Sequence, residues 1–175
     1  MRRLAAIAAA AALAISTAAP AAPPKAPRYL DAVRQELARL GVVATCEPAK
    51  GVCSFERGLG RLGVTVAATA ECSDETDTVY VAVPRLVAVA GDGPDLALAR
   101  RLLELNRRLV TAKLEWDPLA RAIRLSTVLS TDTSFDRKAF RSQLLALFAA
   151  AERILPELEA LAAGGAGAPA GGAAP

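Results

Sequence analysis

Apolar residues recur along this chain at two different spacings, which divide it into helices and strands. Spacings of three and four residues are typical of helices with one apolar face, and they predict three helices: Tyr29–Leu40, Pro94–Arg108 and Ser134–Leu161. Four runs between the first two helices have the composition of strands: Val42–Cys46, Val52–Arg57, Val64–Glu71 and Thr78–Val89. Because the links between these runs are short and rich in turn residues, an antiparallel meander is expected.

The segment after the second helix changes to a period of two. Its apolar side chains alternate with polar ones at four positions: Val110, Ala112, Leu114 and Trp116. Asp117–Ala120 is typical of a turn, because Asp is favoured at the first position and Pro118 presets φ at the second. Folding about this turn pairs Leu114 with Ile123 and gives the hairpin one apolar and one polar face. The sequence therefore predicts an α+β fold, a twisted antiparallel sheet packed by the first and last helices.

Local signals predict where the later helices begin and bend. Asp92 or Gly93 is expected to cap the second helix, and Thr133 or Ser134 the last one, because short polar side chains accept the free N–H groups of a first turn. Within the last helix, Pro156 lacks a backbone donor and crowds the preceding turn. A kink is expected there.

The order of these elements resembles that of a known family. An apolar helix with a Leu-Asn pair at its end, Leu102–Asn106, is followed directly by the hairpin at Leu109–Leu129 and then by the long last helix. In this combination the chain resembles the YbjN domain family over about residues 29–161. The resemblance implies a type III secretion chaperone-like fold without catalytic residues. It also implies that two copies pair through the sheet and the second helix.

The N-terminus has the pattern of a secretory signal. Arg2 and Arg3 precede the apolar run Leu4–Ile15, and cleavage after Ala18 or Ala21 would leave small residues at positions −1 and −3. The run is shorter than the ~20 apolar residues of a membrane span, and a retained anchor is the alternative. A periplasmic or secreted protein is expected. The chain then divides into a signal peptide (1–21), a Pro/Ala linker (22–28), the α+β domain (29–162) and a disordered Gly/Ala/Pro tail (163–175).

Charge and histidine content exclude several classes of function. Two of the 21 basic residues lie in the predicted signal, so 19 remain against 18 acidic residues. A chain with a net charge this close to zero has no strong positive electrostatic potential to attract nucleic acid, so a nucleic-acid partner is not expected. The sequence has no histidine, which removes Ser-His and Cys-His triads and the commonest metal ligand. No catalytic, cofactor-binding or metal-binding residue is predicted, and an enzyme is not expected.

Three further features have a plain structural explanation. Gly58–Gly63 matches GxGxxG, but its third glycine opens a strand, whereas a dinucleotide needs a helix N-terminus there. The acidic run Asp74–Asp77 lies in a predicted turn and lacks the spacing of a calcium loop. Trp116 ends the apolar face of its strand opposite Arg121, so a residue at the edge of the core in cation–π contact is favoured over ligand stacking.

The cysteines fit an oxidising compartment. Folding Val42–Arg57 about Ala49-Lys50 places Cys46 opposite Cys53, which predicts a disulfide between them. Cys72 is then left as a buried free thiol. Pairing through Cys72 remains an alternative on spacing alone.

The second helix has more apolar residues than one buried face requires. A stripe displaced from its main apolar face contains Leu96, Ala99 and Leu103. Exposed apolar stripes mark interfaces, so these residues are predicted to form a dimer or partner surface. The alternative is that both stripes are buried within one chain.

The function expected from these observations is an exported, non-enzymatic domain that binds another protein in a chaperone-like or regulatory role. The alternative is a small-molecule-binding or carboxylate-only hydrolytic domain. A deep pocket with converging Asp or Glu would favour that alternative, whereas a flat apolar face or open sheet edge favours the protein binder.

Overall fold

Nine elements make up the computed structural model, which describes residues 25–165. The strands are β1 (Ala44–Glu47), β2 (Val52–Leu59), β3 (Val64–Ser73), β4 (Thr78–Ala88), β5 (Lys113–Asp117) and β6 (Ala122–Ser130). The helices are α1 (Leu30–Arg39), α2 (Leu96–Arg108) and α3 (Arg137–Gly165). All six strands form one antiparallel sheet in the order β1-β2-β3-β4-β6-β5. The predicted α+β fold and its meander are confirmed.

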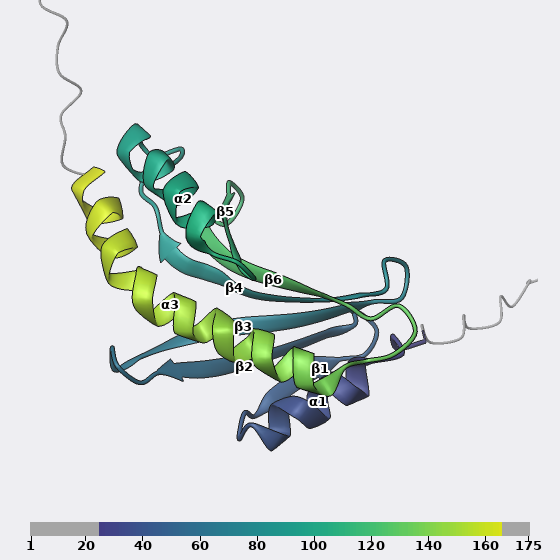
Figure 1. The fold of residues 1–175 in the computed structure, drawn as a ribbon. Coiled ribbons are helices and arrows are strands. Elements are labelled where there is room, and N and C mark those ends of the chain that lie inside the picture. The colour runs from purple at the N-terminus through teal and green to yellow at the C-terminus, as the bar shows by residue number, and fades with distance from the viewer. Residues whose placement is uncertain (1–24, 166–175) are drawn as a thin grey trace, which may run out of the picture.

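The helices lie on one face of the sheet. Figure 1 shows α3 running across that face, with α1 beside its N-terminal half and α2 beside its C-terminal end. Alternate side chains of β4 point toward the helices and are almost fully buried: Val79, Val81 and Val83. Residues of α3 that lie three and four apart meet them in the core: Leu144, Leu147, Ala151, Ile154 and Leu158. The period of each element thus decides which side chains form the core.

Each of the four hairpins closes with a four-residue loop whose last residue has a positive φ. The residues with positive φ at these positions are Gly51 (69°), Gly63 (67°), Asp77 (49°) and Arg121 (47°). Glycine is required at Gly51 for two reasons. Its φ is positive, and a Cβ there would approach Pro27 Cγ to 2.7 Å and the Cys72 carbonyl oxygen to 2.8 Å. The GxGxxG match therefore ends in a hairpin loop, as predicted.

The same loop type corrects the predicted register of the last hairpin. Leu114 pairs with Leu125 instead of Ile123, because Asp117 pairs with Ala122 across a four-residue loop. The two-residue loop assumed from sequence needs a positive φ at its first position, which the ring of Pro118 forbids. The shift is two residues, so the apolar face is preserved. The strand begins only at Lys113.

Both later helices begin at an aspartate that the sequence prediction had not chosen. Asp95 caps α2, and its Oδ1 accepts the N–H of Leu98 at 2.8 Å. At the start of α3, the Oδ1 of Asp136 accepts the N–H groups of Lys138 and Ala139, each at 2.9 Å. The predicted caps at Asp92 or Gly93 and at Thr133 or Ser134 were therefore wrong. In both cases the capping carboxylate is the one next to the first turn, where it can reach the free N–H groups.

The last helix continues through its internal proline. The structure includes Pro156 within α3, which runs on to Gly165, and Figure 1 shows the helix bending along its length. Residues 163–165, predicted as part of the tail, are helical. None of the helices within residues 25–165 is long and apolar enough to cross a membrane.

The chain ahead of α1 is attached to the domain. Arg28, predicted to lie in the linker, donates its backbone N–H to Asp74 Oδ1 at 3.0 Å, and its guanidinium pairs with Asp74 and Asp77. The acidic loop thus holds the end of the linker. The predicted signal peptide and most of the predicted tail lie outside the described residues.

Candidate functional site

The face of the sheet opposite the helices holds an open groove of about 710 Å³. It extends over β1, β2, β3 and the middle of β4. Its lining includes the charged residues Glu56 and Arg57, and most of its floor consists of small uncharged residues: Thr45, Ser54, Gly58, Ala67, Thr69 and Pro84. At one end Val43 is 91% exposed. No helix of the described chain covers this face, so extended backbone could lie directly on the strands.

A polar cluster borders the groove on the same face of the sheet. Glu115 of β5 accepts hydrogen bonds from the Tyr80 hydroxyl at 3.0 Å and the Ser126 hydroxyl at 2.9 Å. Beside it Arg124 pairs with Asp117, whose pKa is lowered by the backbone N–H of Ala120 and by the guanidinium. These side chains bond to one another, so this half of the face is polar, and the buried Nε of Arg124 is the atom of the cluster without a hydrogen-bond partner among the described residues.

Neither surface gathers acidic groups for catalysis or metal binding. Glu56 is the one carboxylate that lines the groove, and no group of three His, Cys, Asp or Glu side chains within residues 25–165 is placed to hold a metal ion. Asp74 and Asp77, the ends of the acidic run, pair with Arg28 instead. The lining of the groove therefore contains no pair of carboxylates of the kind used in acid–base catalysis.

The predicted stripe on α2 is exposed. Leu96 is 67% exposed and Leu103 is 72% exposed, with half-buried Ala99 between them, whereas Leu98 and Leu102 face the core. Two large apolar side chains one helical turn on either side of Ala99 form an uncovered apolar strip. The alternative that buries both stripes within one chain is therefore wrong.

A buried carboxylate joins the first and last helices. Glu36 of α1 has no exposed surface. Its Oε2 accepts from Arg141 at 2.9 Å, and its Oε1 accepts from Arg137 at 2.9 Å and from Arg39 of its own helix. These three guanidiniums, Arg141 first, outweigh the effect of burial and lower the pKa of Glu36 to about 2.

Sequence reasoning had missed Glu36. Its one local signal is a position directly beside Leu37 in the apolar stripe of α1, where a carboxylate would need a partner. The partners on α3 lie 101 and 105 residues away in sequence. Spacing within one helix does not reveal them.

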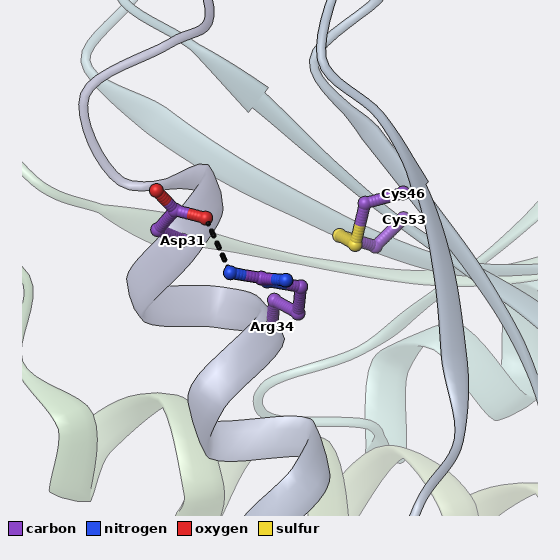
Figure 2. Close-up of a disulfide and its surroundings, with 4 residues drawn as sticks. All are labelled: Asp31, Arg34, Cys46 and Cys53. Carbon is purple, nitrogen blue, oxygen red and sulfur yellow. Dashed lines mark hydrogen bonds and ion pairs between the residues drawn. A yellow bond between two sulfur atoms is a disulfide. The ribbon is translucent and has the colours of Figure 1, made fainter.

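The predicted disulfide is present. Cys46 and Cys53 face each other across β1 and β2 and are bonded, and Figure 2 shows them beside α1, where Asp31 and Arg34 form an ion pair. Cys72 is free and buried, as expected. Burial, with the nearby carboxylates of Asp74 and Glu71, raises the pKa of its thiol to about 12, so this thiol is unreactive at neutral pH.

The predicted partner of Trp116 was wrong. Trp116 pairs with Ile123 because of the two-residue shift in register, and it is half-buried against the core. Among the described residues the one cation–π contact is that of Arg28, whose Cζ lies 5.2 Å from the centre of the Tyr29 ring. The location of Trp116 at the edge of the core is confirmed.

Comparison with known proteins identifies the fold. No protein-family model matches the sequence, and no curated protein matches it. YbjN from E. coli has 19% sequence identity and a TM-score of 0.58, over 75% of this chain and 91% of that chain. A chain of the ExsC–ExsE complex has 17% identity and a TM-score of 0.56, over 75% and 94%. A chain of the HopA1–SchA chaperone–effector complex has 11% identity and a TM-score of 0.51, over 74% and 94%. The YbjN-like, type III secretion chaperone-like fold is confirmed.

Proposed function

We propose that this chain is a non-enzymatic protein that binds an extended segment of another protein, in a chaperone-like role, on the helix-free face of its sheet. The groove of about 710 Å³ over β1 to β4 carries the proposal. Most of its floor is made of small uncharged side chains, Glu56 and Arg57 are the charged residues of its lining, and β1 is an edge strand with unpaired backbone groups on its outer side. An added segment can therefore gain main-chain hydrogen bonds at the edge and side-chain contacts on the floor.

Two further observations support a protein partner over a small molecule. The groove is open along the sheet, and one carboxylate, that of Glu56, lines it, whereas a carboxylate-only hydrolase needs two that converge. A chain of similar fold occurs in the HopA1–SchA chaperone–effector complex. Both observations favour a partner that is another protein, of which this chain would bind one segment.

Filling the groove should weaken capture of that partner. Ala67 is exposed on the groove floor, so Ala67→Arg introduces a long side chain into the groove without disturbing the core. Capture from a periplasmic extract should fall by about tenfold or more for a partner that the unaltered protein retains. The matched control is Ala38→Arg, which adds the same side chain at an exposed position of α1. Equal capture by both variants would contradict the groove, and no capture by the unaltered protein would contradict the function.

Export from the cytosol is part of the proposal. The signal-like N-terminus supports it, and so does the Cys46–Cys53 disulfide, because such bonds persist in oxidising compartments. The mature chain would begin at Ala19 or Ala22, and the function is then exercised in the periplasm or outside the cell.

We further propose that two copies pair through the exposed stripe of α2. Leu103→Glu should convert a dimer into a folded monomer, because a charge at the centre of an apolar contact loses its hydration. Light scattering at about 100 μM would measure the mass, since weak homodimers have micromolar dissociation constants. Leu145→Glu on α3, where Leu145 is 45% exposed, is the control and should leave the dimer intact. A monomeric mass for the unaltered protein would rule the dimer out.

A further inference from the structure

A second cavity lies between α2 and α3, on the side of the sheet away from the groove. Figure 1 shows α2 alongside the C-terminal end of α3. The cleft between them has a volume of about 380 Å³, within the range of small-ligand sites. Its floor is apolar and includes Leu105, Leu109 and Ile154. It shares no lining residue with the groove.

The polar lining of this cleft consists of three arginines and one glutamate. Arg101 already pairs with two carboxylates: it donates to Glu157 Oε2 at 3.1 Å and to Glu104 Oε2 at 2.7 Å. Arg108 and Arg153 are exposed and pair with no carboxylate within residues 25–165. Two guanidiniums without a counter-charge therefore line a cleft that already has an apolar floor.

We propose that this cleft binds an aliphatic carboxylate, a ligand that the groove would not select. The carboxylate would lie between Arg108 and Arg153, whose planar groups can each donate two hydrogen bonds to it, and the aliphatic part would contact the floor beside Ile154. A singly charged carboxylate fits better than a phosphate, because Glu157 lines the same cleft and repels a second negative charge. A free fatty acid or a peptide ending in leucine would each supply this chemistry.

The test uses two defined probes on the mature protein at fixed ionic strength. Octanoate represents a free acid, and acetyl-Ala-Leu with a free C-terminus represents a peptide; the amidated dipeptide lacks the charge. Titration is followed by NMR, through the backbone N–H signals of α2 and α3 and the Nε–H signals of arginine. Arg108→Gln removes one ligating group, and Arg100→Gln removes the same charge from an exposed position of α2 outside the cleft, so it controls for long-range attraction.

The expected result is saturable binding of at least one carboxylate probe, with the largest shifts at the ends of α2 and α3 that line the cleft. Arg108→Gln should weaken it by about tenfold, the usual effect of losing a charged hydrogen bond, and Arg100→Gln by less than about twofold. Whichever probe binds more tightly identifies the source of the ligand. Equal weakening by both variants, equal binding of the amide, or no saturation up to about 10 mM would overturn the proposal. These outcomes do not depend on capture of a partner by the groove.

Discussion

Replacement of Glu36 by glutamine should cost about 3 kcal/mol in the free energy of unfolding, the lower end of the range for breaking a buried ion pair. The side chain is fully buried, and both of its oxygens accept from arginines. Glutamine keeps the size but loses the charge, so Arg137, Arg141 and Arg39 are left facing one another without a counter-ion. The arginines themselves are about half exposed, which holds the cost to the lower end. Urea unfolding at neutral pH measures the difference.

The same variant makes a prediction about pH. The folded-state pKa of Glu36 is lowered from 4.5 to about 2, so its contribution to stability is complete above pH about 4.5 and is lost as the pH falls toward 2. The unaltered protein should therefore lose more stability over this interval than Glu36→Gln does. Glu159→Gln, at an exposed position of α3, is the control and should change neither the stability nor its pH dependence. A loss below about 0.5 kcal/mol for Glu36→Gln would show that the arginines find other partners.

Removal of the disulfide is expected to cost about 2.5 kcal/mol. The bond joins residues seven apart, and closing so short a loop in the unfolded chain accounts for a loss of this size. The double variant Cys46→Ala/Cys53→Ala removes both thiols, which avoids leaving a polar group at Cys53, where no surface is exposed. A reducing agent should lower the stability of the unaltered protein to about that of the double variant and leave the variant unchanged.

The disulfide and the proposed export can be examined in the same preparation from the native host. Intact-mass analysis should find a chain beginning at Ala19 or Ala22. Alkylation under denaturing, non-reducing conditions should modify one thiol, that of Cys72. Three modified thiols would exclude the bond, and a chain that retains Met1 would exclude cleavage of the signal.

Turn chemistry explains why the first hairpin was predicted correctly and the last one was not. In the first hairpin the assumed centre at Ala49-Lys50 coincides with the middle of the four-residue loop, so Cys46 and Cys53 were matched from sequence alone. In the last, Asp117–Ala120 was assumed to be the whole turn, but the loop extends to Arg121 in a left-handed conformation. The alternation of side chains fixed which residues face the core. It left open a shift of two residues, because such a shift keeps the same faces.

The sequence by itself determined the class of each element, the buried face of each strand and helix, and the disulfide, because all of these follow from contacts between residues close in the chain. The tertiary structure alone decided where the two proposed binding surfaces and the buried carboxylate lie. The groove needs strands β1 to β4 side by side, the cleft needs α2 beside α3, and Glu36 needs arginines more than 100 residues away. Each is made by side chains that are far apart in sequence. The local spacing of apolar residues does not predict which faces of distant elements will pack together.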